Sequence, residues 1–308
     1  MEKITRRVFI RKTAQTTAVI GILSSVEPVI SAEPQIQKRL LGKTGYKATI
    51  LGLGGGYLTK EMKKEDAVSI VNKVIDSGIN YIDTAANYGD GFSEEYIGEV
   101  MKTRRKEVFL ATKTNLRGKG ESTEQINASL KKLNTDHLDM LQLHYVNTED
   151  ELKKVLDKDG SLSAVVEAKK AGKTRFIGIT AHNWPLLAAA LEVYPFDTVL
   201  LPVSALDHSF SEFSAMILPV VKKHNVGVIC MKSLGGGVLK DYLSIKDCLI
   251  YSMSMPVTVT IVGMKSVNEV EDNVSIARSF VSMKPEELDS MHAKVKSAVP
   301  VDKHGWNK

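Results

Sequence analysis

The pattern of apolar and polar residues along the chain alternates between strand-like and helix-like segments. Short apolar runs of strand length occur eight times, at 51–55, 79–84, 107–113, 137–145, 174–180, 196–203, 226–232 and 257–263. The later runs are apolar on consecutive positions, which is typical of strands buried on both faces. Between the runs, apolar residues recur at helical spacing. We therefore expect eight βα units, with one helix after each strand.

Capping residues predict where several of these helices begin. Asn183 precedes an apolar segment and is expected to cap it. Ser93 predicts a helix start before two acids, and Ser122 with Gln125 resembles a capping box. The long helical segment after the fourth strand is expected to break at Gly160.

Eight βα units in about 250 residues have the size of a (β/α)8 TIM barrel. A doubly wound sheet also alternates, but its dinucleotide loop should open a helix directly with G-x-G-x-x-G. Here several residues separate the glycines at 52–56 from the next helix. We therefore predict an α/β barrel with a short N-terminal β-hairpin around Gly42–Gly45. Its later helices are expected at 211–224, about 240–254 and 267–279, with a further one from Pro285.

The first 32 residues have the order of an export signal. Basic residues, including Arg6 and Arg7, precede the apolar run "TTAVIGILSSV" and a small residue, Ala32. This order predicts a signal peptide and resembles the twin-arginine type. The apolar run is shorter than the ~20 residues that span a bilayer. We expect a signal at 1–32 and a folded domain at 33–308. A disordered basic tail and an uncleaved anchor are the alternatives.

Composition changes this picture little. The chain is 43% hydrophobic and 25% charged, as globular proteins are. The signal carries +3 of the net charge of +5, so the remainder gives no electrostatic basis for nucleic-acid binding. Cys230 and Cys248 belong to no paired-cysteine motif, and no metal site is predicted. They could form a disulfide in an exported protein, but two unpaired buried thiols are the favoured interpretation.

Polar residues stand where three neighbouring strands end, which is the end of a barrel that carries chemistry. Asp83 ends the second strand with Tyr88 in the loop beyond it, Lys113 ends the third, and His144 ends the fourth. Asp83 and Lys113 could pair, which offsets the cost of burying them. A charged lysine near Tyr88 would stabilise the phenolate and improve the phenol as a proton donor. His144 could donate a hydrogen bond to a carbonyl oxygen, so the set suits carbonyl reduction with a hydride from a cofactor.

The segments "YIDTAANYG", "FLATK" and "LDMLQLH" resemble the motifs of the aldo-keto reductases. The resemblance covers about residues 38–280 and includes "RLLGKTG", "IGITAHN", "MKSLGGG" and "VGMKSVNEVEDN" in order. It implies a (β/α)8 barrel with a catalytic tetrad, here Asp83, Tyr88, Lys113 and His144. In that family the tyrosine is the acid, the histidine orients the carbonyl, and the aspartate and lysine tune the tyrosine.

The same resemblance implies an extended nicotinamide cofactor across the barrel mouth. Glycines after the first strand would lie by the ribose and Thr180 by the carboxamide. The segment from Lys232 would follow the pyrophosphate, and the last helix would hold the adenosine. The implied cofactor-binding residues are Gly54, Gly55, Thr180, Lys232, Ser233, Leu234, Gly235, Lys265 and Asn273.

NADP(H) is favoured over NAD(H) by Lys265 and Ser266 at the start of the last helix, since a 2′-phosphate needs such partners. Glu269 opposes this, because many NADPH-using relatives carry an arginine there. Leu200 and Val203 stand where relatives usually have a glutamine and an aromatic ring that stacks on the nicotinamide. Unusual cofactor binding is therefore expected.

The predicted function is an exported NAD(P)(H)-dependent oxidoreductase that interconverts a carbonyl and an alcohol, with Tyr88 as general acid. Its partners would be a small-molecule carbonyl or alcohol substrate and, transiently, the twin-arginine export machinery. No nucleic acid and no stable membrane span are expected, and the predicted location is the periplasm. A cofactor-binding sensor or regulatory subunit on the same fold is the alternative.

Overall fold

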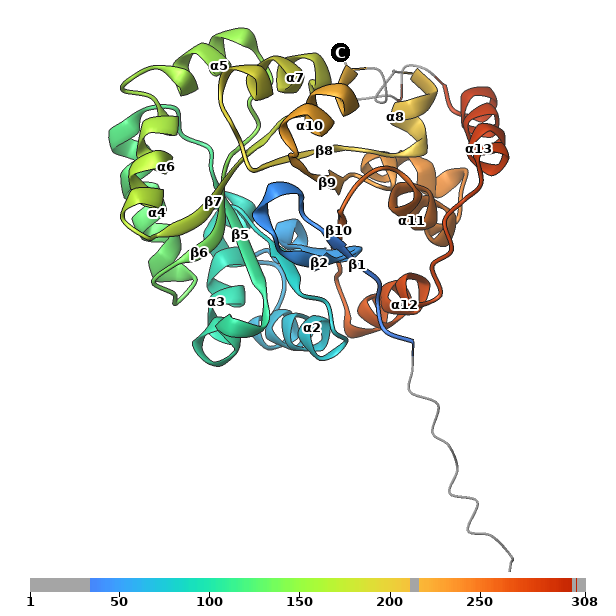
Figure 1. The fold of residues 1–308 in the computed structure, drawn as a ribbon. Coiled ribbons are helices and arrows are strands. Elements are labelled where there is room, and N and C mark those ends of the chain that lie inside the picture. Colours follow the sequence, from blue (N-terminus) through green and yellow to red (C-terminus); the bar gives the residue numbers. More distant parts are fainter. Residues whose placement is uncertain (1–33, 211–215, 301–302, 304–308) are drawn as a thin grey trace, which may run out of the picture. The chain divides into compact units, whose positions relative to one another are not determined.

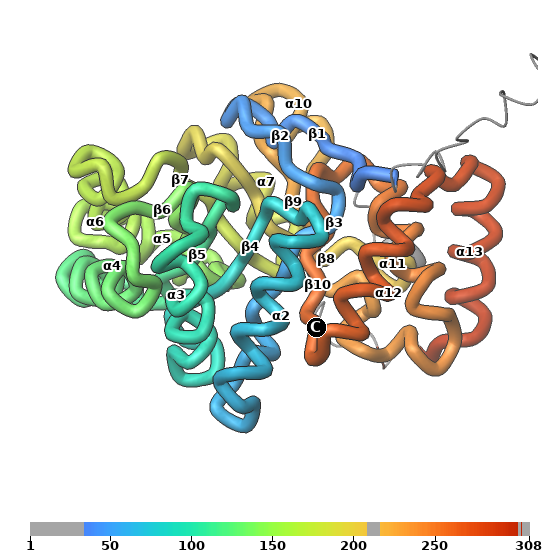
Figure 2. Tube along the Cα trace, turned by 90° about the horizontal axis from the view of Figure 1, so that it is seen from below, coloured from blue at the N-terminus to red at the C-terminus, as the bar shows by residue number. Residues whose placement is uncertain are grey.

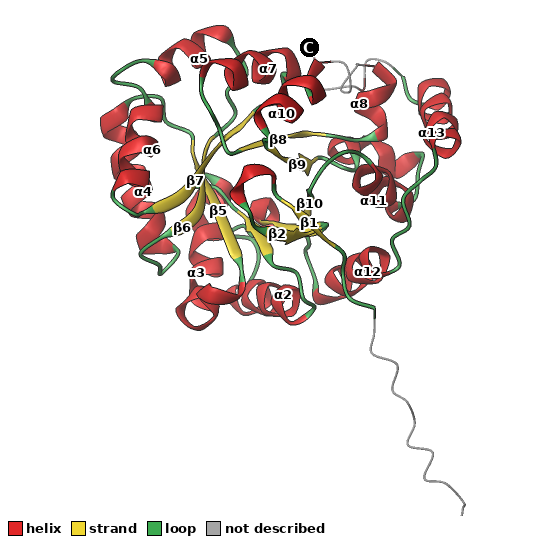
Figure 3. Ribbon diagram, viewed as in Figure 1, coloured by secondary structure: helices red, strands yellow, loops and turns green. Residues whose placement is uncertain are grey.

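A closed barrel of eight parallel strands forms the centre of the molecule, with helices around it (Figures 1 and 3). The computed structural model describes residues 34–210, 216–300 and 303. Around the barrel the strands follow the order β10-β3-β4-β5-β6-β7-β8-β9. Their bounds are β3 Leu51–Gly54, β4 Tyr81–Asp83, β5 Phe109–Thr114, β6 Leu138–Leu143, β7 Thr174–Thr180, β8 Thr198–Pro202, β9 Gly227–Met231 and β10 Val259–Val262. The predicted (β/α)8 barrel is confirmed.

Two separate cores follow from the alternation of side chains along each strand. Inward residues such as Tyr81, Phe109 and Met140 pack inside the barrel. Outward residues such as Ile82 and Leu141 pack under the helices in a larger core. The strands are therefore buried on both faces, which explains their consecutive apolar residues.

A hairpin of β1 (Lys38–Leu40) and β2 (Lys47–Thr49) lies at one end of the barrel (Figure 2), as predicted. The 3-10 turn Gly42–Thr44 joins its strands. Leu41 and Ala48 are fully buried in the inner core, among residues that begin the barrel strands. The hairpin therefore closes the end of the barrel where the strands start.

The helices depart from the expectation of one per strand. Two of them follow β6, because the chain breaks at Gly160 as predicted. A 3-10 segment, Gly235–Asp241, replaces the start of the helix expected at 240–254. The helix bounds are α2 Lys64–Asp76, α3 Phe92–Arg104, α4 Lys119–Lys132, α5 Glu149–Leu156, α6 Ser161–Lys170, α7 Trp184–Val193, α8 Ala205–Phe210, α10 Leu218–His224, α11 Ile245–Ser254, α12 Val267–Arg278 and α13 Pro285–Ala298.

One predicted cap is confirmed and two are wrong. Asn183 caps α7 by accepting a hydrogen bond from the N–H of Leu186. Gly91, in a left-handed conformation, begins α3 in place of Ser93. The hydroxyl of Ser93 instead donates to the carbonyl of Gly55, 2.9 Å away, because tertiary packing offers it a buried partner.

The predicted capping box at Ser122 and Gln125 is also wrong, since α4 begins three residues earlier. The N-cap is Gly118, which has no side chain to accept a hydrogen bond, and only the reciprocal bond forms: the Glu121 carboxylate accepts from the N–H of Gly118 at 2.8 Å. Gln125 instead accepts from the hydroxyl of Thr114 at 2.7 Å. A tertiary contact again outweighs a local pattern.

The predicted signal at 1–32 lies outside the described residues, as do residues 211–215 of the helix expected at 211–224. Within the described part of the chain, no helix is long and apolar enough to cross a membrane. Cys230 and Cys248 are both free and buried, in line with the favoured interpretation. Burial raises the pKa of each thiol to about 12.

Candidate active site

Asp83 and Lys113 form a buried ion pair at the ends of neighbouring strands. Asp83 is the last residue of β4, and Lys113 lies on the inward face of β5. The Lys113 Nζ donates to Asp83 Oδ2 and, at 2.7 Å, to the carbonyl oxygen of Thr84. Both side chains are fully buried, so neither charge could be kept there without the other.

The hydroxyl of Tyr88 lies beside this pair. Lys113 Nζ is 3.3 Å from Tyr88 Oη and 4.6 Å from the centre of its ring. Tyr88 begins a 3-10 turn in which Gly89 and Asp90 have left-handed backbones, with φ of 55° and 58°. A Cβ at Gly89 would approach the Cα of Thr59 to 2.8 Å, so the turn needs a glycine there. This tight turn keeps Tyr88 at the mouth of the barrel, beside Lys113.

The charges of the pair set the electrostatics at Tyr88. Burial raises the pKa of Asp83, and Lys113 and Gln142 oppose that rise. Burial alone would lower the pKa of Lys113, but Asp83 and Tyr88 outweigh it and raise the pKa overall. Lys113 therefore stays protonated at neutral pH and directs a positive charge at the phenol oxygen.

His144 follows β6 and places its ring edge-on to Tyr88, with the ring centres 5.6 Å apart. Its pKa is lowered to about 2, first by burial and then by the charges of Lys113 and Arg117. Its ring is therefore neutral at neutral pH. Its buried Nδ1 has no hydrogen-bond partner among the described residues. A neutral imidazole can donate a hydrogen bond to a carbonyl oxygen, but it is a poor source of a proton.

The structure also places two residues at the site that the sequence patterns left unassigned. Gln142 Nε2 donates to Asp83 Oδ1 at 2.8 Å. Arg117 donates to the carbonyls of His144 and Tyr145, at 3.0 and 2.9 Å, and pairs with Glu151. The inward position of a polar residue on β6 could have indicated Gln142. Arg117 lies in a loop with no motif, and no sequence signal indicated it.

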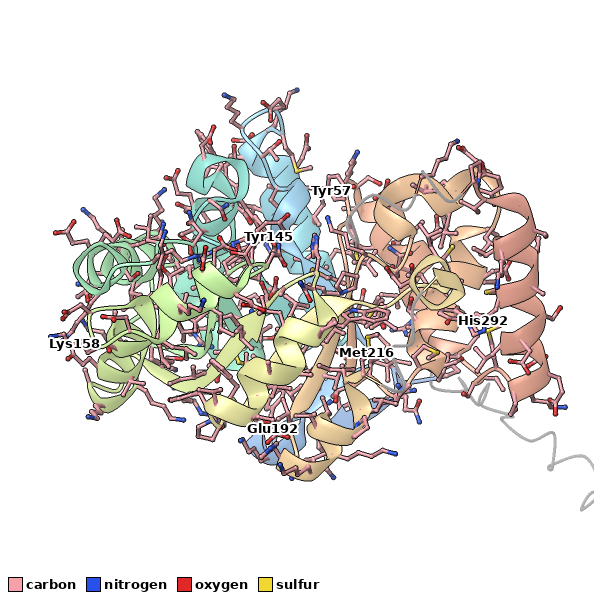
Figure 4. All side chains as sticks on the ribbon, turned by 90° about the horizontal axis from the view of Figure 1, so that it is seen from above. Tyr57, Tyr145, Lys158, Glu192, Met216 and His292 are labelled. Carbon is pink, nitrogen blue, oxygen red and sulfur yellow. The ribbon has the colours of Figure 1, made fainter. Side chains whose placement is uncertain are left out.

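Arg117 holds the loop after β6 in an unusual backbone conformation. Tyr145 has a φ of 56°, which is rare for a residue with a side chain. The N–H of Tyr145 donates to Thr180 Oγ1 at 2.9 Å, and its carbonyl accepts from Arg117. Half of the Tyr145 side chain is exposed, and it lies with Tyr57 at the end of the barrel away from the hairpin (Figure 4).

The residues predicted at the nicotinamide end lie on the ends of β3 and β7. Thr180 is buried, and its Oγ1 accepts a hydrogen bond from the N–H of Tyr145. Its hydroxyl could therefore donate a hydrogen bond to a carboxamide oxygen. Gly54 ends β3, and a Cβ there would meet only ordinary contacts. A Cβ at Gly55 would approach Ser93 Oγ to 2.5 Å, so packing alone requires that glycine.

The segment predicted at the pyrophosphate forms a compact turn after β9. Lys232 is exposed with a φ of 60°, Ser233 is buried and Leu234 is half-buried. Gly235 begins a run of three left-handed glycines, with φ of 59°, 67° and 104°. Such a run lets a polar ligand approach the backbone closely. The turn therefore fits a phosphate-containing group.

The residues predicted at the adenosine end lie on and before α12. Ser266 caps this helix, and Glu269 Oε2 accepts from the backbone N–H of Lys265 at 2.8 Å. The ammonium of Lys265 lies 4.5 Å from the centre of the Tyr57 ring. Asn273 is buried on α12. Lys265 with a helix N-terminus fits an anionic group, and the carboxylate of Glu269 opposes it.

Lys265 and Ser266 also border an open cleft of about 690 Å³. The cleft runs between the loop after β3 and the start of α12. Its other lining residues are Tyr57, Thr59, Glu61, Met62, Lys63, Asp66, Ser69, Ile70 and Val267. The anionic end of a ligand could therefore reach Lys265 from solvent.

Leu200 and Val203 place no aromatic ring at the mouth. Leu200 lies in the core inside the barrel, and Val203 is fully buried after β8. The carbonyl of Val203 accepts from Ser252 Oγ at 2.8 Å. Packing thus uses both positions, as expected from their apolar side chains.

The barrel and the four side chains at its strand ends are those that the sequence motifs imply. This combination is typical of the aldo-keto reductases, a class of oxidoreductase. The model of the Aldo/keto reductase family matches residues 50–248, which is more than half of the chain. The chain belongs to the aldo/keto reductase family.

The relatives found include enzymes and solved barrels. L-galactose dehydrogenase of Arabidopsis thaliana is 27% identical over 291 residues, covering 81% of this chain and 90% of its own. The oxidoreductase YqkF of Bacillus subtilis is 29% identical over 218 residues, covering 67% of each chain. The holo form of an aldo-keto reductase from Bacillus halodurans superposes with a TM-score of 0.74 at 24% identity, covering 88% of this chain and all of that one. This likeness supports the barrel fold.

Proposed function

We propose that this chain interconverts a carbonyl and an alcohol with a nicotinamide cofactor, and that Tyr88 transfers the proton. The observation that carries the proposal is the 3.3 Å contact between Tyr88 Oη and the buried, charged Lys113. A positive charge at that distance stabilises a phenolate relative to a phenol. Tyr88 would therefore be the group that gives its proton to a developing alkoxide.

The four side chains would divide the chemistry of the reduction. A bound nicotinamide would supply the hydride. Tyr88 would donate its proton to the substrate oxygen, and Lys113 would stabilise the phenolate left behind. His144, whose ring is neutral, would donate a hydrogen bond that orients the carbonyl. Asp83 would keep Lys113 charged.

NADP(H) is the favoured cofactor. Lys265 and the N-terminus of α12 support it, because both attract a 2′-phosphate. Solved aldo-keto reductases of Klebsiella pneumoniae contain NADP or NADPH; the one with NADP and acetate superposes with a TM-score of 0.70, at 22% identity, covering 85% of this chain and 96% of that one. Glu269 weakens the preference, so NAD(H) is the competing cofactor.

The substrate class is a small aldehyde, ketone or sugar. Relatives named L-galactose dehydrogenase and pyridoxal 4-dehydrogenase support both a sugar and an aldehyde. The net charge of the chain beyond residue 32 is close to neutral, so it gives no electrostatic basis for a nucleic-acid partner. No specific observation favours the alternative of a cofactor-binding sensor, since the tetrad is complete and these relatives carry the names of enzymes.

Turnover by Tyr88→Phe tests the proposal. Aldehydes, ketones and sugar alcohols would be screened with both cofactors, and the best substrate used for kinetics. Tyr88→Phe should lower kcat at least ~100-fold, because general-acid catalysis of this kind contributes about that much or more, with the nucleotide Kd unchanged. Tyr194→Phe, distant along the chain on the C-terminal side of α7, is the control and should be unaffected. Turnover near the wild-type level in Tyr88→Phe would exclude the proposed role.

Export by the twin-arginine route is a further part of the proposal, carried by Arg6 and Arg7 in the first 32 residues. Such a route transports folded proteins, so a nucleotide bound before export could travel with the enzyme. Fractionation of cells that express the whole chain, with an Arg6→Lys/Arg7→Lys variant as comparison, tests the location. Equal amounts of both proteins in the periplasm would contradict the prediction.

A further inference from the structure

Gln142 lies inside the barrel at the level of the Asp–Lys pair. It is fully buried on the inward face of β6, where it pairs in register with Lys113 on one side and Gly178 on the other. Its Nε2 donates to Asp83 Oδ1 at 2.8 Å, two strands away. Gln142 thus reaches past Lys113 to the carboxylate that keeps Lys113 charged.

The neighbouring strand leaves room for this side chain. A Cβ at Gly178 would approach the Cγ of Gln142 to 3.0 Å and Thr198 Oγ1 to 2.6 Å. A side chain at position 178 would therefore crowd both Thr198 and Gln142. The absence of a side chain at Gly178 is a steric condition for the contact between Gln142 and Asp83.

The two oxygens of Asp83 have different partners. Within the described residues, Oδ2 accepts from Lys113 and Oδ1 accepts from Gln142. An amide donor on the second oxygen fixes the plane of the carboxylate and favours its ionised form. The hydrogen bond from Gln142 lowers the pKa of Asp83 against the larger effect of burial.

Gln142 carries a cost that a purely structural residue would avoid. Its Oε1 is buried without a hydrogen-bond partner among the described residues. Leaving a buried acceptor unpaired is costly, whereas an apolar side chain of similar size would leave no acceptor unpaired. The hydrogen bond that the Gln142 amide donates to Asp83 therefore explains why an amide stands at this position.

We propose that Gln142 is a positioning residue that holds the Asp83 carboxylate ionised and aligned on Lys113, and so keeps the ammonium of Lys113 in place beside Tyr88. The inference rests on the proposed role of Tyr88 as proton donor. Other titratable groups also face the pair: Tyr88 and His144 from the loops after β4 and β6, Glu94 from α3, and Tyr81 from β4 below it. Gln142 differs from them in that its side chain does not titrate.

Gln142→Met tests the inference, because methionine has a similar size and no donor. Asp83 would then be protonated at higher pH, and Lys113 would lose part of its partner charge. We expect kcat to fall about 10- to 100-fold, with substrate KM and nucleotide Kd within about twofold, as befits the loss of one buried bond to a charged group. The acid limb of the kcat profile should move to higher pH. Met140→Leu, on the same face of β6, is the matched control and should leave the profile unchanged.

Two further variants separate a positioning role from a packing role. Gln142→Glu restores a donor only while the new carboxyl is protonated, so its activity should fall as the pH rises, opposite to Gln142→Met. Gly178→Ala keeps the glutamine but displaces it, and should reproduce the pH shift of Gln142→Met. Melting temperatures within a few degrees of wild type would show that each variant is folded.

Carbon NMR titration of the Asp83 carboxyl decides the inference without turnover. The Asp83 signal is assigned by comparing each protein with its Asp83→Asn counterpart. The Asp83 carboxyl should titrate at higher pH in Gln142→Met than in wild type, since it loses the hydrogen bond from Gln142. An unchanged titration and an unchanged pH profile in folded Gln142→Met would overturn the inference. A wild-type protein that turns over no carbonyl would overturn the proposed function instead, and the titration would still test Gln142.

Discussion

At the scale of single residues, the charge state of His144 decides which side chain can donate a proton. Its pKa is lowered to about 2, mainly by burial, so at neutral pH it is not the imidazolium that could act as a general acid. Lys113 is protonated but is held by Asp83 and by the carbonyl of Thr84. Tyr88 is the group that we propose transfers the proton, and the ammonium of Lys113 lies 3.3 Å from its hydroxyl oxygen.

The half-buried histidines His144 and His182 also predict how stability depends on pH. In the unfolded chain, His144 and His182 take up a proton as the pH falls through about 6.5. In the folded protein, burial lowers their pKa values to about 2 and about 4. The unfolded state therefore binds more protons below pH 6.5, and the free energy of unfolding should decrease as the pH falls from 7 to 5.

Urea unfolding at pH 7, 6 and 5 measures this decrease. Each histidine should contribute a loss of up to about 1 kcal/mol per pH unit below 6.5. His144→Asn removes one contribution and should flatten the dependence. Identical slopes in wild type and His144→Asn would show that His144 is protonated in the folded state.

Glu269 is the residue that we expect to limit the preference for NADP(H). Its carboxylate caps the backbone of Lys265, where a 2′-phosphate would lie, and adds a negative charge there. Glu269→Gln keeps the capping geometry and removes the charge. The Kd for NADP should fall about 3- to 10-fold and the Kd for NAD should stay the same, since unit charges some angstroms apart at a surface interact by about 1 kcal/mol. Calorimetric titration with both nucleotides measures this, and equal changes in the two Kd values would contradict it.

At the scale of elements, α3 and α4 approach each other through a glycine. A Cβ at Gly98 would lie 2.9 Å from the Cα of Leu133 and still closer to the backbone before it. Gly120 lies in the first turn of α4, and a Cβ there would meet nothing within 4 Å. The two glycines thus occupy opposite environments in neighbouring helices.

Alanine at these positions should have opposite effects. Gly98→Ala should lower the free energy of unfolding by about 1–3 kcal/mol, because it overpacks a rigid backbone contact. Gly120→Ala should raise it by up to about 1 kcal/mol, because alanine favours the helix. Chemical denaturation compares them directly. A stabilised Gly98→Ala would mean that the helices can separate at little cost.

At the scale of the whole molecule, the hairpin closes the inner core where the strands begin. Leu41 is fully buried inside the barrel, whereas its neighbour Leu40 is 56% exposed. Leu41→Ala should cost about 2–5 kcal/mol through the cavity it leaves, and Leu40→Ala less than about 0.5 kcal/mol. Thermal and urea unfolding of both variants test this. Equal costs would show that the hairpin does not contribute to the core.

Much of the fold and of the tetrad could be predicted from the sequence. The eight strands were evident because each is buried on both faces, so apolar residues fill consecutive positions. Asp83, Lys113 and His144 could be placed together because parallel strands bring their C-terminal ends to one edge. The predicted contact between Asp83 and Lys113 is confirmed, and so is the proximity of Lys113 to Tyr88.

Other features were beyond sequence patterns because they depend on contacts between distant segments. Ser93 and Gln125 have the side chains of caps, but a buried carbonyl and a buried hydroxyl from other elements bind them instead. Arg117 acts on a loop that follows a different strand, and its partners are backbone carbonyls that have no sequence signature. The contact between Gln142 and Asp83 could not be predicted, because it depends on which strands are neighbours and on the space that Gly178 leaves on β7.

The sequence by itself determined the barrel, its hairpin and the family. The spacing of apolar residues, the polar residues at the strand ends and the order of the motifs are all properties of the chain alone. It also determined which side chains carry the proposed chemistry. The tertiary structure alone decided their state: that Lys113 is enclosed with Asp83, that His144 is neutral, and that Gln142 binds the second oxygen of Asp83. The physical reason is that protonation and orientation depend on burial and on partners from other strands, which exist only once the barrel has closed.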